Sequence, residues 1–469
     1  MSLLALAGTN SATGGYEIDN SIKLEDDNDE FLTRTNASGT NRKTWTVSVW
    51  FKQTELASMR NSYTEIWDGG VFGEGTRMGM DNTDRFWIDI GGGTGNTGTN
   101  YRNFSTLKLR DTSAWYHLVV ALDTTQSTAA NRLKVWLNGT EITAWDQQQI
   151  PAQNYQCAVE AGVTMTWGAY NATYHGFSGY LAECNYVDGV TATQNDFGEY
   201  DEDSGIWKPK EYTGSYGTNG SYLDFEIAND LGANAKGNDV NFSLNNITSA
   251  NQATDTPTNN FCTLNPLYNY AYGNTITEGA TKIYGAANNW GGGKAAFGLT
   301  SGKWYWEIKQ LANGNTFMGI QTDGEDNISS GNAHSQNTTV CFYTDGTIQY
   351  SNGSETSTSA ANSIAANSIV GFALDLDSAT QTIKVYNNNS LVTAFGSSGT
   401  ANLSTYNIAD KTVFPFVALY DRTVNMNFGG YTVSSISSPQ SDANGYGNFE
   451  YSPPSGYYAL CTKNLEEYG

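Results

Sequence analysis

The sequence predicts an all-β protein made of two antiparallel β-sandwiches joined by an irregular linker. Short apolar or alternating runs bounded by Gly, Asn and Asp recur along the chain, and such runs are typical of strands and turns. Amphipathic helical patterns are almost absent. The strand pattern is interrupted over residues 229–264 by a polar stretch poor in large apolar side chains, which favours a linker or a long inter-domain wrap.

The composition supports a folded, β-rich chain. Aromatic residues make up 13% of the 469 positions, whereas disordered chains lack the large apolar groups that offset the entropy of ordering. Gly, Asn and Ser suit turns, and Tyr, Trp, Val and Thr suit strands. A chain of this length can form two or three domains, each with a core of its own.

The first sandwich is assigned to residues 21–228, behind an N-terminal arm at residues 1–20. One short helix is expected at residues 191–200, where a Thr or an Asp can serve as its cap. The clearest strands of this sandwich are expected at residues 44–52, 85–91, 114–122 and 131–139. The Asn-Gly pair in the turn "LNGTE" favours a tight hairpin after the last of them.

The second sandwich is assigned to residues 265–430, followed by an irregular C-terminal segment at residues 431–469 that contains "SPPSG". Its clearest strands are expected at residues 303–309, 370–376, 382–388 and 423–430. The turn "YTDGT" carries the Asp-Gly pair that favours a hairpin here as well.

Consecutive aromatic residues in the stretch "SGKWYWEIK" could form either a sugar platform or the inside of a sheet. In a strand, Trp304, Trp306 and Ile308 point to one side, and Tyr305 and Glu307 point to the other. Two Trp and one Ile on the same face are typical of the core side of a sheet. The two Trp residues are therefore predicted to be buried.

The charge of the chain excludes some classes of partner. The formal net charge is −23, so a nucleic acid backbone or an anionic lipid surface would repel the protein. No stretch approaches the roughly 20 apolar residues that a membrane span needs. The first residues, "MSLLALAGTN", lack the basic region of a secretory signal peptide. We therefore expect neither nucleic-acid binding nor membrane insertion.

The cysteine and histidine residues do not indicate a zinc site or a disulfide framework. The cysteines are odd in number, lie far apart and include no CxxC pair, which favours a reducing cytoplasm. Only three histidines occur in the sequence, so a histidine-based metal site is not expected. The cysteines are Cys157, Cys184, Cys262, Cys341 and Cys461.

No paired carboxylates in the sequence predict catalysis. Glycoside hydrolases with a β-sandwich fold place an acid and a nucleophile on one strand face, so that both flank one glycosidic bond. The nearest pattern, "EYDED" at residues 199–203, follows the predicted helix and has no alternating aromatic residues. We expect a solvated acidic turn there, and no enzymatic activity.

Aromatic residues in Gly-rich segments are candidates for carbohydrate binding, because a sugar needs an exposed aromatic face beside carboxamide or carboxylate groups. The alternative is that these residues anchor their loops by packing, since large aromatic side chains tend to be mostly buried. The candidates are Trp67 with Asp68, Tyr101, and Trp290 with Asn288 and Asn289.

The first sandwich resembles the laminin-G/concanavalin A-like jelly-roll family. The resemblance rests on "SIKLEDDNDEFLTRT", "RKTWTVSVWFK", "SAWYHLVVALDTTQSTAANRLKVWLNGTEI" and "GYLAECNYVDGV". It implies that His117 is a buried, hydrogen-bonded core residue. Laminin-G-like domains also often hold calcium at the sandwich rim, which implies a calcium site at Asp81, Asn82 and Asp84. The alternative is that these residues form an ordinary turn, because Asp and Asn are common in turns. No other cofactor is expected.

The second sandwich resembles the SPRY family, which is also a concanavalin-like β-sandwich. The matching pieces are "SGKWYWEIK", "FMGIQTD", "VCFYTDGTIQYSNG", "IVGFALDLDSATQTIKVYNNNSLV" and "FPFVALYDRTVNMNFGG", in this order. The resemblance implies two concanavalin-like jelly rolls in one chain.

The whole chain resembles virion surface proteins of tailed, often marine, bacteriophages. This rests on the two sandwiches together with "QNDFGEYDEDSGIWKPKEY", "TDTPTNNFCTLNPL" and "SPPSGYYALCTKNL". The resemblance implies a non-enzymatic tail fibre or appendage protein that recognises a host-surface glycan or protein. The alternative is a capsid or tail decoration protein with a purely structural role. Other virion proteins and further copies of the chain are the expected partners, at the virion surface after assembly in the host cytoplasm.

Overall fold

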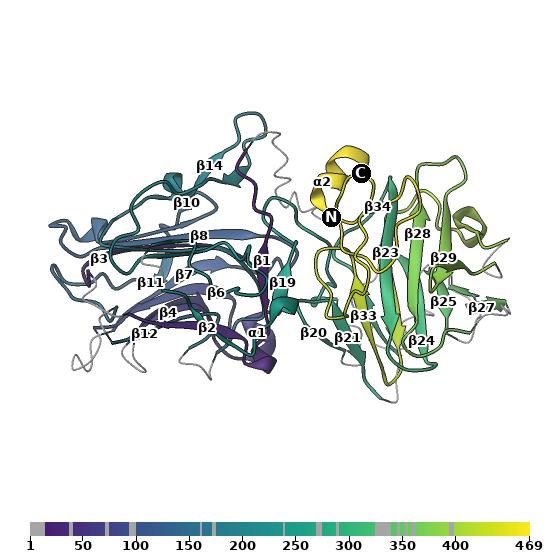
Figure 1. Cartoon of the computed structure of the whole chain (residues 1–469), viewed down its shortest axis with the longest axis horizontal. Coiled ribbons are helices and arrows are strands. Elements are labelled where there is room, and N and C mark those ends of the chain that lie inside the picture. The colour runs from purple at the N-terminus through teal and green to yellow at the C-terminus, as the bar shows by residue number, and fades with distance from the viewer. Residues whose placement is uncertain are drawn as a thin grey trace. The chain divides into compact units, whose positions relative to one another are not determined.

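A computed structural model describes two compact units that divide between residues 259 and 260 (Figure 1). Nearly all of their regular structure is β, which confirms the predicted fold class. The structure describes residues 15–36, 41–70, 75–92, 100–159, 162–170, 175–237, 240–268, 274–287, 290–323, 339–344, 348–351, 355–358, 363–393 and 398–469. Within these ranges, no helix is long and apolar enough to span a membrane.

Unit 1 is a sandwich of two antiparallel sheets, named here the β3 sheet and the β6 sheet. The main path of the β3 sheet runs β10 (Thr140–Glu141), β9 (Leu133–Leu137), β8 (Tyr116–Asp123), β3 (Thr44–Gln53), β13 (Gly179–Asp188), β1 (Ser21–Leu24) and β19 (Gln252–Ala253), with β16 (Ser221–Leu223) and β17 (Lys236–Gly237) attached to β13. The β6 sheet runs β11 (Trp145–Gln147), β7 (Tyr101–Lys108), β6 (Arg85–Ile90), β5 (Thr76–Met80), β4 (Thr64–Gly69), β12 (Thr164–Trp167), β2 (Phe31–Thr35) and β18 (Ser243–Asn245).

Alternation along the strands places the core of unit 1 between these two sheets. From β3, Val47 and Val49 are fully buried, and from β6, Phe86 and Ile88 join the same apolar cluster. Smaller elements include α1 (Ala57–Arg60) and the hairpin of β14 (Gly198–Tyr200) with β15 (Trp207–Pro209). The helix predicted at residues 191–200 is a single 3-10 turn, Gln194–Asp196, capped reciprocally by Thr193 and Asp196.

Unit 2 is a second sandwich, made of the β23 sheet and the β24 sheet. The β23 sheet runs β20 (Thr275–Thr277), β21 (Lys282–Gly285), β33 (Arg422–Asn427), β23 (Lys303–Gln310), β28 (Ile369–Asp375), β29 (Thr382–Asn387) and β30 (Ser390–Leu391), with β31 (Ala401–Asn402) beside β29 and β34 (Tyr458–Ala459) beside β23. The β24 sheet runs β22 (Gly291–Lys294), β32 (Val413–Leu419), β24 (Thr316–Thr322), β25 (Thr339–Tyr343), β26 (Ile348–Ser351) and β27 (Glu355–Thr358).

Trp304 and Trp306 on β23 are fully buried in the core of unit 2, which confirms the prediction for this strand. Trp306 stacks on Phe372 of β28, with ring centroids 5.3 Å apart. Tyr305, on the opposite face, is also buried, because the C-terminal segment covers it and sets Phe449 edge-on to its ring at 5.1 Å.

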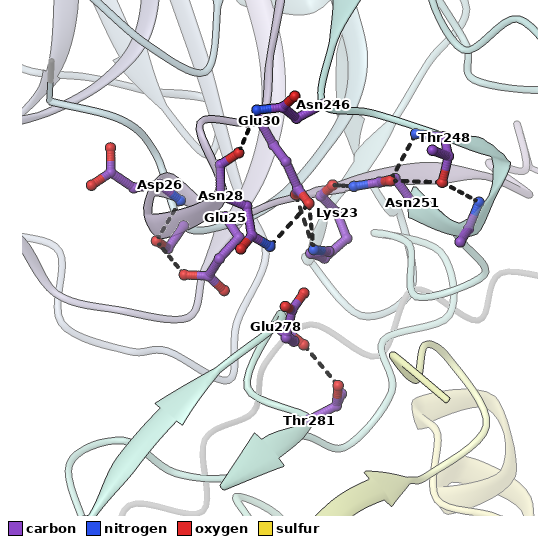
Figure 2. Close-up of polar contacts among 12 residues, drawn as sticks. Lys23, Glu25, Asp26, Asn28, Glu30, Asn246, Thr248, Asn251, Glu278 and Thr281 are labelled. Carbon is purple, nitrogen blue, oxygen red and sulfur yellow. Dashed lines mark hydrogen bonds and ion pairs between the residues drawn. The ribbon is translucent and has the colours of Figure 1, made fainter. Parts of the chain in front are cut away.

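In residues 229–264, expected to form a linker or a long inter-domain wrap, the structure has short strands that pair with strands of unit 1. Most of this stretch packs on unit 1, where β18 pairs with β2 and β19 pairs with β1. Figure 2 shows two hydrogen bonds that its side chains make to backbone oxygens. The Asn246 amide donates to the backbone oxygen of Asn28 at 2.9 Å, and the Asn251 amide donates to the backbone oxygen of Lys23 at 3.1 Å. The few large apolar side chains of the stretch, among them Leu231, Phe242 and Ile247, are buried in the core of unit 1, and hydrogen bonds to backbone oxygens also hold the stretch in place.

Asp255 anchors the end of the same stretch. Its carboxylate accepts hydrogen bonds from the Lys52 ammonium at 2.8 Å and from the Trp115 indole at 3.0 Å, and all three side chains are buried. Nearby, the Thr258 hydroxyl donates to the backbone oxygen of Ile18 and accepts from its N–H. Residues 15–20 of the predicted arm are therefore held against unit 1, and residues 1–14 lie outside the described residues.

The C-terminal segment, residues 431–469, contains regular structure that the sequence did not predict. β34 pairs in parallel with β23, and the chain then forms α2 (Thr462–Tyr468). The buried carboxylate of Asp442 accepts hydrogen bonds from the Asn464 amide at 2.8 Å and from the Ala459 N–H at 2.9 Å. These bonds join the start of the segment to its end.

Candidate ligand-binding pocket on the β6 sheet

A row of alternating charges crosses the outer face of the β6 sheet. The strand register places Asp68 of β4 opposite Arg77 of β5, Arg77 opposite Asp89 of β6, and Asp89 opposite Arg102 of β7. This row faces away from the core because the alternate residues of β5 and β6 are the ones in the apolar cluster. Opposite charges on neighbouring strands stabilise such a row.

The neighbouring row carries a carboxylate and two aromatic rings. Glu65 of β4 lies opposite Gly79 of β5, Gly79 opposite Trp87 of β6, and Trp87 opposite Phe104 of β7. A Cβ atom at position 79 would clash with the carbonyl oxygen of Thr64, so this position requires glycine.

A cavity of about 170 Å³ lies beside these rows on the outer face of unit 1. The aromatic residues of the lining form its walls, with Tyr63 edge-on to Trp87 at a centroid distance of 5.3 Å. Tyr63 and Phe104 are half-buried, whereas Trp87 is buried. The lining residues are Tyr63, Glu65, Arg77, Trp87, Arg102, Phe104 and His175.

Arg77 lies at the centre of the charges. Its guanidinium is 5.3 Å from the ring centroid of Trp87 and 4.4 Å from that of Tyr170. One of its nitrogens, Nη1, lies 3.4 Å from Glu65 Oε1, and the other, Nη2, lies 3.6 Å from Asp89 Oδ2. Both distances exceed the roughly 2.7–2.9 Å of a direct charge-assisted hydrogen bond, so Arg77 neutralises the two carboxylates only in part.

The carboxylates of Glu65 and Asp89 are fully buried, and each keeps one oxygen without a partner. Glu65 Oε2 and Asp89 Oδ1 accept no hydrogen bond from the described residues. Burial raises the pKa of Glu65 well above its usual value; Arg77 opposes this shift, and the charges of Asp68 and Asp89 add to it. An unsatisfied buried acceptor costs free energy, which a ligand that donates a hydrogen bond would recover.

His175 closes one side of the cavity. Ser62 Oγ lies 3.0 Å from its Nδ1 atom, and its backbone has a left-handed φ of 55°. Burial lowers the pKa of His175, and the positive charges of Arg77 and Arg60 lower it further. The imidazole is therefore neutral at neutral pH and adds no positive charge to the cavity.

A larger, more open depression of about 540 Å³ also lies on unit 1, but its charged groups are already bound. Arg42 donates to the backbone oxygens of Cys157 and Gly92 at 2.7 and 2.6 Å. Asp188 accepts from the N–H groups of Asn41 and Asn219 at 2.8 and 3.1 Å. The smaller cavity is therefore the stronger candidate site, because acceptors without partners point to a missing ligand.

The structure changes the interpretation of Trp67 and Asp68. Trp67 is fully buried in the core and stacks on Tyr186 at 5.9 Å, so its ring cannot serve as a sugar platform. The reason is a β-bulge between Glu65 and Trp67, which turns the indole to the inner face of the sheet. Asp68 is buried as well, but it lies in the charged row beside the cavity.

The other carbohydrate candidates, Tyr101 and Trp290, are not among the residues that line the cavity. Tyr101 is half-buried and packs edge-on to Tyr155 at 4.9 Å. Trp290 is half-buried against Phe317 of unit 2 at 4.9 Å, which is the loop-anchor alternative. The expected partners of Trp290, Asn288 and Asn289, lie outside the described residues.

The expected calcium ligands Asp81 and Asp84 are bound to arginines. Asp81 Oδ2 accepts from Arg85 Nη2 at 2.6 Å and from its Nε at 2.9 Å, and Asp84 Oδ2 accepts from Arg110 Nε at 2.7 Å. Both carboxylates are buried, whereas Asn82 is exposed. Among the described residues, no group of three or more His, Cys, Asp and Glu is arranged to hold a metal ion. Calcium binding stays a prediction.

His117 is a buried, hydrogen-bonded core residue, as predicted. Its Nε2 atom lies 2.9 Å from Ser48 Oγ, and its Nδ1 atom accepts from the Trp207 indole at 2.9 Å. Its ring stacks on Trp50 at 4.5 Å, and burial lowers its pKa to about 3. The acidic turn at residues 199–203 is largely exposed, with the Asp201 carboxylate accepting from Ser204.

Comparisons with known proteins find solved structures of low similarity to this chain. No protein-family model and no curated protein match this chain. The SPRY domain of human HERC1 is 17% identical, covering 33% of this chain and 91% of its own, with a TM-score of 0.26. Domains LG4-5 of the mouse laminin alpha1 chain are 8% identical, covering 88% and 89%, with a TM-score of 0.31. A heptameric SAP-like pentraxin from Limulus polyphemus is 15% identical, covering 39% and 82%, with a TM-score of 0.29.

Proposed function

We propose that this protein is a non-enzymatic virion protein, a tail fibre or appendage, which binds a host-surface glycan in the cavity of the β6 sheet. The observation that supports this is a buried carboxylate oxygen without a partner, Glu65 Oε2, in a cavity with aromatic walls. Sugars present several hydroxyl donors on a ring with apolar faces, and such a cavity matches both properties.

The placement of the cavity suits recognition by a repeated protein. Its floor consists of strand residues, which a sandwich holds more rigidly than loops. One small pocket binds a sugar weakly, but several copies on one particle add avidity without new contacts. A virion protein present in many copies would bind a cell surface firmly in this way.

The test is binding of the purified chain to host-surface polysaccharide, measured by calorimetry for the wild type and two variants. We expect Glu65→Gln, which keeps the shape of the side chain, and Trp87→Ala, which removes a wall, to weaken binding at least tenfold. Tyr284→Ala, which removes an exposed ring on unit 2, is the control and leaves the affinity unchanged. Analysis of the sugar products accompanies each measurement.

Each outcome decides between the competing functions. Saturable binding without release of shorter sugars supports the proposal. Release of shorter sugars would overturn the non-enzymatic part of it. An absence of binding, in a protein that still attaches to particles lacking it, would favour the capsid or tail decoration protein instead.

A further inference from the structure

We propose, on the basis of the function proposed above, that the cavity takes a sugar with a free amine, bound as its ammonium ion at Glu65 Oε2. Among the lining residues, Glu65 Oε2 is a buried acceptor without a hydrogen-bond partner and Trp87 Nε1 is a buried donor without one. The ligand must therefore offer a donor to the carboxylate, and a hydroxyl oxygen of the sugar can accept from the indole. An ammonium group has three donors and no acceptor, whereas each hydroxyl has one donor.

The charges that face Glu65 favour a cation. Asp68 shares its strand and Asp89 approaches from β6, while Arg77 of β5 and Arg102 of β7 supply the positive charges. With Glu65 ionised, these groups carry three negative and two positive charges, and the neutral His175 does not change the balance. Arg102 is also half exposed, so water screens it.

Burial and the nearby negative charges of Asp68 and Asp89 raise the pKa of Glu65, so its carboxyl keeps a proton to a higher pH than an exposed carboxyl does. A ligand ammonium would take over the role of that proton and leave Glu65 ionised. A carboxylate or sulfate on the ligand would face the same excess of negative charge, so acidic sugars are excluded.

The aromatic walls and the size of the cavity fit one amino sugar. Trp87, Tyr63 and Phe104 present rings to the cavity, and a cation beside aromatic rings is stabilised further. At about 30 Å³ for each water, the cavity of about 170 Å³ equals five or six water molecules, which is on the order of one sugar ring. The ligand is therefore a terminal or branching residue of a glycan.

The test compares four sugars with the full chain by calorimetry and saturation-transfer NMR at pH 5 and pH 7. Glucosamine carries the free amine, glucose lacks it, N-acetylglucosamine blocks it, and glucuronate is acidic. We expect glucosamine to bind at least tenfold more tightly than the other three. Its affinity is expected to rise with pH, by up to about tenfold for each unit below the pKa of Glu65, because binding displaces the proton. Free lysine is included to test whether the cavity binds an ammonium group without a sugar ring, such as a lysine side chain of a protein.

Variants complete the test. Glu65→Gln is expected to remove both the preference for glucosamine and its pH dependence, while Glu141→Gln, which changes an exposed carboxylate of unit 1, leaves both unchanged. Equal affinity for glucose and glucosamine would refute the proposal that the ligand carries a free amine, and it would leave the proposal of glycan binding unaffected. An affinity for lysine equal to that for glucosamine would refute the proposal that the ligand is a sugar. If no sugar binds and Glu65→Gln leaves polysaccharide binding unchanged, the proposed function falls as well.

Discussion

Glu65 in unit 1 and Glu307 in unit 2 occupy similar positions with opposite surroundings. Both lie on the outer face of a sandwich, both are buried, and burial raises the pKa of both. Glu307 accepts hydrogen bonds from the N–H groups of Glu450 and Tyr451 at 2.9 Å, from the Tyr305 hydroxyl at 3.1 Å and from the Asn427 amide at 3.3 Å. Among the described residues, Glu65 has only the long contact with Arg77.

The difference shows what each carboxylate is for. Four donors offset the cost of burying Glu307, and two of them belong to the backbone of the C-terminal segment, so this carboxylate holds that segment on β23. Nothing comparable offsets the burial of Glu65, whose second oxygen faces a cavity. A buried charge with all its partners is structural, whereas one that faces a cavity without them is prepared for a ligand.

The largest expected effect is on the stability of unit 2. Glu307→Ala leaves two N–H groups, a hydroxyl and an amide without their acceptor, so we expect the free energy of unfolding to fall by about 3–5 kcal/mol. Urea denaturation measures the loss, and hydrogen exchange should show opening of residues 431–469. Glu466→Ala, which changes an exposed residue of α2, is the control. A loss below about 1 kcal/mol would refute the structural role.

The next effect has the opposite sign. Glu65→Gln removes a buried charge that lacks good partners, so the free energy of unfolding is expected to stay the same or rise by about 1 kcal/mol. Urea denaturation of the variant beside the wild type measures this change. A loss as large as that of Glu307→Ala would show that Glu65 is also structural, and the contrast between the two residues would disappear.

Glu183 of unit 1 is a third buried carboxylate, with two hydrogen-bond donors, and its pKa gives the size of the expected effect on stability. It accepts from the hydroxyls of Tyr16 at 3.0 Å and Tyr222 at 2.7 Å, and burial raises its pKa from 4.5 to about 7. The folded state therefore holds a proton that the unfolded state releases between these values, so stability is greatest below pH 4.5 and falls as the pH rises to 7. The loss from this group is at most about 3 kcal/mol.

Thermal unfolding from pH 4 to pH 8 measures the effect of Glu183. Glu55 also titrates near pH 7, because burial and the charge of Glu25 raise its pKa, so the wild-type curve alone is not specific. The informative quantity is the difference between the wild type and Glu183→Gln. We expect the variant to have the shallower pH dependence, and parallel curves would contradict the assignment.

The smallest expected effect concerns calcium at Asp81 and Asp84. Arginines already bind both carboxylates, so a calcium ion would have to displace them. We expect millimolar calcium to change the melting temperature of the chain by less than about 1 °C relative to chelator. A rise of several degrees would show that calcium displaces the arginines and that this loop is a metal site after all.

Much of the fold could be predicted from local sequence. Alternation predicted the strands, and it placed Trp304 and Trp306 in a core, because side-chain direction in a regular strand follows position alone. Most of the stretch at residues 229–264 packs on unit 1, through a few buried apolar side chains such as Phe242 and through polar side chains. Its composition is that of a linker, and the hydrogen bonds made by Asn246 and Asn251 join it to residues far away in the sequence.

The candidate site could not be predicted in the same way. Glu65, Arg77 and Asp89 come from three strands, and only the register between the strands brings them together. A signal did exist in "RFWIDI", where Trp87 and Asp89 alternate with the core residues and so share the outer face. For Trp67 the rule of alternation misleads, because a bulge reverses the side on which the ring lies.

The pairing of β1 with β19 has a consequence for how the chain folds during synthesis. β1 lies near the start of unit 1, and its partner at Gln252–Ala253 lies near the end of that unit. Contacts between strands so far apart in the sequence are slow to form, because a long loop must close first. On the ribosome, the first strand must therefore wait with an open edge until nearly all of unit 1 has been translated. This delay makes the nascent chain a natural client for chaperones, which would shield that edge until its partner emerges.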